Sequence, residues 1–266
     1  MRLITIPIII LIIFILFALF TPVLLLEGIE NILPGDVKQN TAEIRQNAAN
    51  LMIDISSLLG RFDTCVDLYT YLIERFPDSA EFYGKKALYL HKLGRLDEAV
   101  TALDGAIVRD PENIEYLLRK ARLTKALYRN DESNQTYQQI DQITPKTALN
   151  YAYSGDAALD RSKYIQAFDR YTKSLALDPS NSLIWEKRGD VIFALLTIPT
   201  AGLDADEELR NKDLYTEGIK SYENAVRLKP DRIAEITQKM SKRSDLFVPK
   251  SIAELESRYT RYRYLG

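Results

Sequence analysis

A proline recurs every 34 residues through the middle of the chain. The prolines at this spacing are Pro77, Pro111, Pro145 and Pro179. A further proline, Pro230, follows one and a half periods later. A fixed period of this length is typical of repeats that stack so that each contacts only its neighbours. The sequence therefore predicts a repeat array over residues 46–232.

One period, residues 80–113, contains two helical patterns separated by a turn. Apolar residues recur at spacings of three and four in each half, which places them on one face of a helix. They are Tyr83, Ala87 and Leu90 in the first half, and Leu96, Ala99, Val100, Leu103, Ala106 and Ile107 in the second. Gly94 suits the left-handed backbone conformation that ends a helix, and Pro111 prevents the second helix from continuing. Each period is therefore predicted to be a helix–turn–helix.

This pattern resembles the tetratricopeptide repeat (TPR), in which large, small and aromatic residues hold fixed positions before a closing proline. Two periods match it closely, at Tyr83, Ala87, Ala99, Leu103, Ala106 and Pro111, and at Tyr151, Gly155, Ala167, Tyr171, Ser174 and Pro179. Partial matches lie at Gly60, Phe62, Cys65, Tyr69 and Pro77, and at Trp185, Gly189, Gly218, Tyr222, Ala225 and Pro230. The period 114–147 departs most, with Ser133 and Ile140 where alanines are usual.

The resemblance implies an all-α fold, a right-handed solenoid of about five helix–turn–helix repeats. Their expected boundaries are 46–79, 80–113, 114–147, 148–181 and 182–232, the last with an insertion at about 197–213. In the insertion, Asp204 and Glu207 indicate a helix start, so the second helix of the fifth repeat is expected to begin two turns early. Residues 233–266 are expected to form a capping helix and a C-terminal helix, because a solenoid needs its last repeat covered.

The N-terminus carries a run of 24 residues without a charge, from Leu3 to Leu26. As a helix this run is about 36 Å long, more than the roughly 30 Å of a bilayer's hydrocarbon core. A cleaved signal peptide has a shorter apolar stretch and an Ala-x-Ala-like site, and no such site precedes Gly28. Residues 1–26 are therefore predicted to be a single transmembrane anchor, and secretion after cleavage stays the alternative. Residues 27–45 are expected to be a linker and the start of the first helix.

The short basic N-terminal tail predicts on which side of the membrane the solenoid lies. Arg2 and the amino group favour a cytoplasmic tail, which leaves the solenoid on the extracytoplasmic side. The lysine and arginine counts on the two sides of the run nearly balance, so the opposite orientation stays open.

The sequence shows no pattern that indicates a catalytic site or a metal site. The chain has one cysteine and one histidine, and it lacks the motifs of phosphate loops, zinc sites and hydrolase nucleophiles. Cys65 occupies a small buried position of the repeat, which predicts a packed and unreactive thiol. We expect no enzyme, no cofactor and no metal site. The net charge of −2 also disfavours nucleic acid as a partner.

The resemblance implies that the first helix of each repeat lines a concave groove that binds a segment of a partner protein. The candidate groove residues are Glu81, Leu88, His91, Lys92, Arg122, Lys125, Asp156, Asp160, Glu186 and Asp190. Their charge changes sign along the chain, from basic in the middle to acidic in the C-terminal half. Asn50 and Asp54 stand where chaperone-binding members carry Lys and Asn, which disfavours chaperone C-termini as partners.

The sequence thus predicts a membrane-anchored scaffold that recruits a protein or peptide segment through the groove. The alternative is an obligate structural subunit of a membrane-bound assembly, such as a secretion, pilus or envelope complex.

Overall fold

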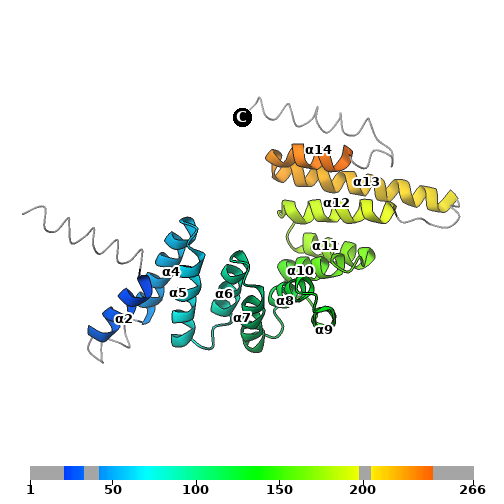
Figure 1. Ribbon diagram of the computed structural model, residues 1–266. Helices are drawn as coiled ribbons and strands as arrows, with labels where there is room; N and C mark the ends of the chain where they lie inside the picture. Colours follow the sequence, from blue (N-terminus) through cyan, green and yellow to red (C-terminus); the bar gives the residue numbers. More distant parts are fainter. Residues whose placement is uncertain (1–20, 33–41, 198–204, 242–266) are drawn as a thin grey trace, which may run out of the picture. The chain divides into compact units, whose positions relative to one another are not determined.

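A computed structural model describes residues 21–32, 42–197 and 205–241 of the chain (Figure 1). Within these ranges every element is an α-helix, apart from one 3-10 turn at Pro230–Arg232 (η1). The chain divides into two compact units, residues 1–136 and 137–266, called the N-terminal and C-terminal units below. The boundary lies inside helix α9 (Asn130–Gln142).

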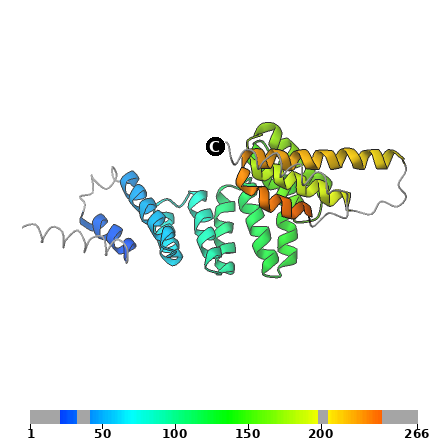
Figure 2. The ribbon, with the colours of Figure 1, turned by 90° about the horizontal axis from the view of Figure 1, so that it is seen from above.

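In the N-terminal unit, a short helix precedes a series of antiparallel helix pairs. The helices are α2 (Pro22–Ile32), α4 (Ala42–Leu58), α5 (Phe62–Arg75), α6 (Ala80–Lys92), α7 (Leu96–Arg109) and α8 (Ile114–Ala126), followed by the start of α9. Members of a pair pack side by side, as α6 and α7 do (Figures 1 and 2). The pairs coincide with the helix–turn–helix units that the proline period predicts.

The C-terminal unit continues the same pairing. Its helices are α10 (Ala148–Leu159), α11 (Tyr164–Leu177), α12 (Ser182–Leu196), α13 (Ala205–Leu228) and α14 (Ile233–Ser241). Helix α13 has 24 residues where α11 has 14, in line with the early helix start expected from Asp204 and Glu207. Helix α14 occupies the place of the expected capping helix. The C-terminal helix expected beyond it lies outside the described residues.

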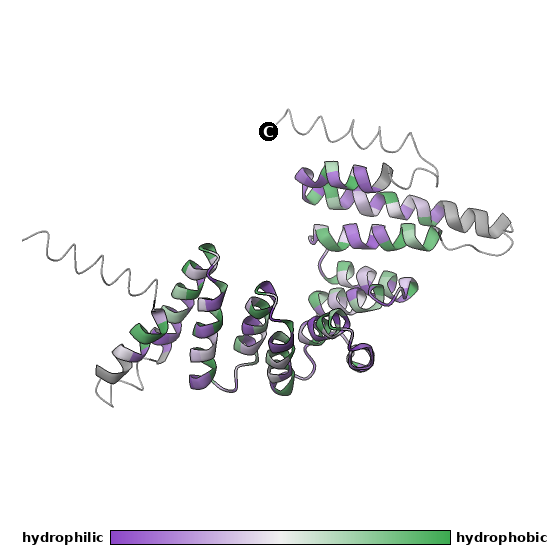
Figure 3. Cartoon of the chain, in the orientation of Figure 1, coloured by the Kyte–Doolittle hydropathy of each residue, from purple (hydrophilic) through white to green (hydrophobic). Residues whose placement is uncertain are grey.

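Helix pairing follows from how hydrophobic residues are distributed along each helix. Figure 3 shows that hydrophobic and hydrophilic residues alternate in short stretches, as an amphipathic helix requires. The small residues Ala87 on α6 and Ala99 and Ala106 on α7 are fully buried. In the C-terminal unit Gly155 faces the ring of Tyr171, where an added Cβ would lie 2.6 Å from a ring carbon. These positions accept only small side chains, which explains the small residues in the repeat pattern.

The first helix of each of four successive pairs ends in the same left-handed turn. The residues with positive φ are Gly60, Gly94, Tyr128 and Ser162, which stand 34 residues apart. At Gly94 the backbone N–H of the next residue donates to Leu90 O (2.9 Å), and that of Gly94 donates to His91 O (3.0 Å). These two hydrogen bonds form the Schellman motif, which satisfies backbone carbonyls at a helix C-terminus. The helix end predicted at Gly94 is confirmed.

The repeat 114–147, which departs most from the TPR pattern, keeps its geometry by a hydrogen bond. Ser133 stands where an alanine is usual and is buried. Its hydroxyl donates to Ala121 O at 2.8 Å, so the buried hydroxyl is satisfied. Cys65 is also fully buried, as predicted, and burial raises the pKa of its thiol to about 11. A thiol with this pKa is protonated at neutral pH and therefore a poor nucleophile.

The last residues of the N-terminal apolar run pack against protein, although the sequence predicted them to be part of a transmembrane anchor. These residues, from Pro22 to Leu26, belong to helix α2, which packs on α4 and α5. Leu26 is buried in the core of the N-terminal unit, so the described end of the run contacts protein. Residues 27–32, expected as linker, continue the same helix. The rest of the predicted anchor, up to residue 20, lies outside the described residues. None of the described helices combines the length and apolar character needed to cross a bilayer.

Candidate functional site

The exposed faces of α6 and α8 form the candidate site of the N-terminal unit. The two first helices approach closely, because Gly84 on α6 carries no side chain and Tyr116 of α8 fills the space above it. An added Cβ at Gly84 would lie 2.5 Å from a carbon of the Tyr116 ring. The six groove residues that the sequence predicted in this unit all lie on these two helices. Of these, Glu81, His91, Lys92, Arg122 and Lys125 are exposed and Leu88 is half-buried.

This surface, which we call the α6–α8 face, carries more positive than negative charge. Its cations are Lys85, Lys92, Arg119, Arg122 and Lys125, and its carboxylates are Glu81 and Glu115. Glu115 is partly neutralised by Arg119, at 3.7 Å in the same helix. Sequence reasoning missed Lys85 and Arg119, although their spacing of four residues from Glu81 and Glu115 places them one helical turn further along the same faces.

Lys92 is held at the end of α6 by aromatic rings. Its ammonium lies 4.8 Å from the ring centroid of Phe62 and 5.1 Å from that of Tyr89. A cation at this distance from a ring face is attracted by the negative charge of the π-system. The side chain therefore remains at the protein surface in a defined position, which suits a contact residue.

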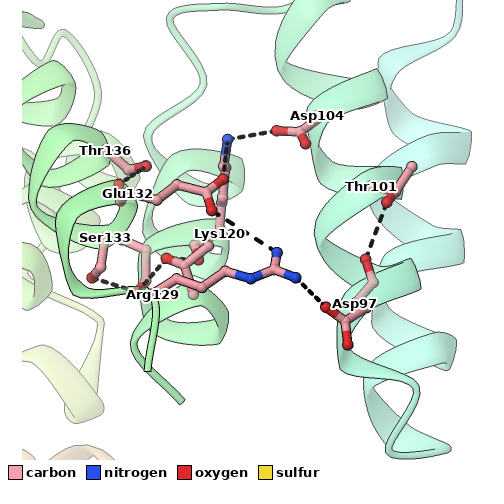
Figure 4. Close-up of polar contacts among 10 residues, drawn as sticks. Asp97, Thr101, Asp104, Lys120, Arg129, Glu132, Ser133 and Thr136 are labelled. Atoms are coloured by element: carbon pink, nitrogen blue, oxygen red, sulfur yellow. Dashed lines mark hydrogen bonds and ion pairs between the residues drawn. The ribbon is translucent and has the colours of Figure 1, made fainter. Parts of the chain in front are cut away.

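A polar network on the other side of α8 fixes this helix against its neighbours (Figure 4). Lys120 binds Asp104 of α7 at 2.6 Å and Glu132 of α9 at 3.1 Å. Burial alone would lower the pKa of Lys120, but the two carboxylates raise it above its ordinary value. Arg129, which directly precedes α9, donates to Asp97 of α7. These contacts hold the three helices in register and so support the α6–α8 face.

The four predicted groove acids of the C-terminal unit are engaged within the chain. Asp156 on α10 is buried and accepts hydrogen bonds from the Tyr171 hydroxyl at 2.6 Å and the Lys187 ammonium at 2.7 Å. Asp160 accepts one from the Tyr137 hydroxyl at 3.0 Å. Lys187 was missed by sequence reasoning, since it lies on the next first helix, 31 residues from Asp156.

The other two acids, on α12, contact the C-terminal helix. Glu186 is 2% exposed and pairs with Arg232 at 2.8 Å and with Lys239 of α14. Asp190 accepts hydrogen bonds from the Tyr222 hydroxyl at 2.7 Å and from Lys239 at 3.1 Å. Burial lowers the pKa of Lys239, but Glu186 and Asp190 raise it above its usual value overall. Helix α14 thus covers the α12 acids with its own positive charge.

Comparisons with known proteins agree with the repeat geometry. Residues 59–114 match the family model for the tetratricopeptide repeat. Among solved structures, TTC0263, a thermophilic TPR protein of Thermus thermophilus, is 17% identical with a TM-score of 0.53. That alignment covers 74% of this chain and 97% of the Thermus protein. No curated protein matches the chain.

Two further solved structures extend the comparison. A monomeric mutant of IFIT1 with Gppp-AAAA is 11% identical with a TM-score of 0.52, over 84% of this chain and 57% of IFIT1. MamA from Desulfovibrio magneticus RS-1 is 14% identical with a TM-score of 0.45, over 70% of this chain and 96% of MamA. At these identities the likenesses to TTC0263 and IFIT1 show the fold alone. Together with the family match, they support a TPR protein with an all-helical, TPR-like solenoid.

Proposed function

We propose that this tetratricopeptide-repeat chain is a non-catalytic scaffold that binds an acidic segment of a partner protein on the α6–α8 face. The TPR fold suggests protein–protein interaction. The positive charge of this face is the reason for proposing an acidic partner segment. Five cations stand there against two carboxylates. A segment with carboxylates would complement them, which favours the correct partner and speeds its encounter.

The C-terminal unit is a weaker candidate for the same role. Its carboxylates on α10 and α12 already have intramolecular partners, among them Lys187 and Lys239. A basic partner segment would have to displace these cations before it gained any attraction of its own. We therefore do not propose the acidic end of the predicted groove as a partner-binding site.

A charge reversal tests the proposal. The double variant Arg122→Glu and Lys125→Glu is expected to lower partner affinity about tenfold at low salt, because both side chains face solvent and exposed pairs contribute roughly 0.2–1 kcal/mol each. High salt should reduce the difference, since it screens exposed charges. The measurement is recovery of the partner in a pull-down from native membranes with the full chain.

The matched control reverses two exposed lysines of the C-terminal unit, Lys146→Glu and Lys220→Glu. It changes the net charge by the same amount away from the α6–α8 face. Equal recovery with wild type and the α6–α8 variant would contradict the proposal. Equal losses with both double variants would reduce the effect to net charge alone.

We also propose that the apolar N-terminal run anchors the scaffold to a membrane, with the solenoid on the extracytoplasmic side. The support is the uncharged sequence from Leu3 onward. With Leu26 in the protein core, the span would lie within residues 3–21, about 28 Å long as a helix. The mature protein should keep Met1 or Arg2 and resist carbonate extraction. An N-terminal sequence that begins near Gly28 would instead indicate a secreted protein.

An alternative function is that of an obligate subunit in a membrane-bound assembly. One surface feature supports it. Helix α4 and the turn after it expose four aliphatic residues, Leu51, Ile55, Leu58 and Leu59, and Leu58 is 88% exposed. Clustered apolar residues at a surface are typical of protein interfaces. The purified chain in detergent separates the two functions: a recruitment module should be monomeric, whereas an obligate subunit should aggregate without its partners.

A further inference from the structure

Tyr128 occupies a backbone position that disfavours it. It follows α8 in the left-handed turn, with φ of 61°, where two of the equivalent residues are Gly60 and Gly94. Its N–H donates to Lys125 O at 3.0 Å, and that of Arg129 donates to Thr124 O at 2.8 Å. These are the two backbone bonds of the Schellman motif, which any residue with this φ can form. The turn therefore requires the positive φ and does not require a tyrosine.

A tyrosine with positive φ carries a conformational penalty, because its Cβ crowds the backbone in the left-handed region. Packing of the side chain could offset that penalty, but Tyr128 is 89% exposed. Among the described residues its ring has no aromatic partner and its hydroxyl no hydrogen bond. The described part of the chain thus gives no stabilising reason for a large aromatic residue at this turn.

Tyr128 follows the C-terminal end of α8, one of the two helices that carry the α6–α8 face. Lys125 lies three residues before it and Arg122 six before it, and both are exposed on α8. Arg129 follows it directly and contacts Asp97, with its side chain 45% exposed. An exposed aromatic residue close in sequence to exposed arginine and lysine residues has the composition of an interaction hot spot, in which tyrosine and arginine are enriched. The ring also keeps few rotatable bonds, so little entropy is lost on binding.

We propose that Tyr128 is a contact residue whose ring packs on an apolar side chain of the partner, next to carboxylates that Arg122 and Lys125 bind. This inference rests on the proposed function and narrows its partner to an acidic segment with a leucine-like or aromatic anchor. An acidic protein segment is favoured over single-stranded RNA because a tetratricopeptide-repeat scaffold suggests protein–protein interaction. The strained turn is then a feature retained for binding rather than for folding.

The test compares two substitutions that relieve the same backbone strain. Tyr128→Gly and Ser162→Gly both place glycine at a turn with positive φ, and each should raise the melting temperature of the full chain by about 2–4 °C. The binding probes are two short synthetic peptides that alternate glutamate with leucine or glutamate with serine. Binding is measured by fluorescence anisotropy.

Wild type and Ser162→Gly are expected to bind the leucine peptide about tenfold more tightly than the serine peptide. Tyr128→Gly should lose this preference while its melting temperature rises, a combination that a structural role for the ring would not give. The double variant Arg122→Glu and Lys125→Glu should bind both peptides weakly. Tyr128→Asn, which also tolerates positive φ, provides a second variant without the ring.

The other outcomes separate this inference from the proposed function. If wild type binds both peptides and Tyr128→Gly keeps the preference for leucine, the inference about Tyr128 is wrong and the charge proposal stands. If wild type binds neither peptide, both are wrong. An oligoadenylate probe that binds more tightly than either peptide, and loses affinity in Tyr128→Gly, would assign the ring to base stacking and overturn the peptide proposal.

Discussion

Replacing Tyr171 by alanine is expected to destabilise the C-terminal unit by about 3–5 kcal/mol, the usual range for removing a large buried aromatic side chain. Tyr171 is fully buried, and its ring lies against Gly155, which has no side chain to fill the space if the ring is removed. Its hydroxyl also donates to the buried Asp156 at 2.6 Å. The substitution therefore leaves a cavity and removes one hydrogen bond to a buried carboxylate. Chemical denaturation followed by circular dichroism measures the loss.

The control is Tyr171→Phe, which keeps the ring and removes only the hydroxyl. It should cost about 1–2 kcal/mol, because Asp156 keeps its pair with Lys187 at 2.7 Å. Hydrogen exchange should show that the loss in the alanine variant is confined to α10, α11 and their neighbours, since a repeat array is stabilised mainly by nearest-neighbour contacts. An alanine variant within about 1 kcal/mol of wild type would contradict the packing described for Tyr171.

The second large effect is expected at the joint between α12 and α14. Lys239→Glu places a third carboxylate beside Glu186 and Asp190, where Lys239 now binds both. Glu186 is almost fully buried and cannot turn to solvent. We expect α14 to separate from α12 at a cost of about 2–3 kcal/mol, below the range for fully buried pairs because the Lys239 side chain is 34% exposed.

Hydrogen exchange of the α12 and α14 amides measures this separation directly. Gln238→Glu is the matched control, because it adds a carboxylate at the neighbouring, exposed position of α14. It should leave the exchange rates close to those of wild type. If Lys239→Glu leaves the protection of α14 unchanged, the ion pairs do not hold this helix in place.

The parts of this fold that could be predicted from sequence are those that repeat. The proline period and the alternation of large and small residues predict the helix pairs, because each repeat places the same residue types in the same contacts. Gly94 marks its turn because glycine accepts positive φ without strain. The equivalent turn at Tyr128 carries no such mark, so its geometry follows only from the period.

Contacts between segments far apart in the chain could not be predicted in this way. Glu186 and Lys239 are 53 residues apart, and no spacing rule connects a repeat with the helix that covers it. The α12 acids therefore looked like an open acidic surface. Leu26 gave a similar ambiguity, because an apolar side chain is equally suited to lipid and to a protein core. The candidate residues of the α6–α8 face lie on first helices at regular spacing, so the period alone gives their places along the helices.

Site-specific photocrosslinking in native membranes can show whether the α6–α8 face holds a partner segment. A photoreactive leucine analogue replaces Leu88 on the face or, as a control, Val108, which is 79% exposed on the second helix α7. Mass spectrometry then identifies the crosslinked peptides. We expect an acidic peptide of one partner at Leu88, its loss in the Arg122→Glu and Lys125→Glu variant, and no such adduct at Val108. Adducts at Val108 alone, or adducts at Leu88 that survive the charge reversal, would mean that the α6–α8 face does not bind the partner through its positive charge.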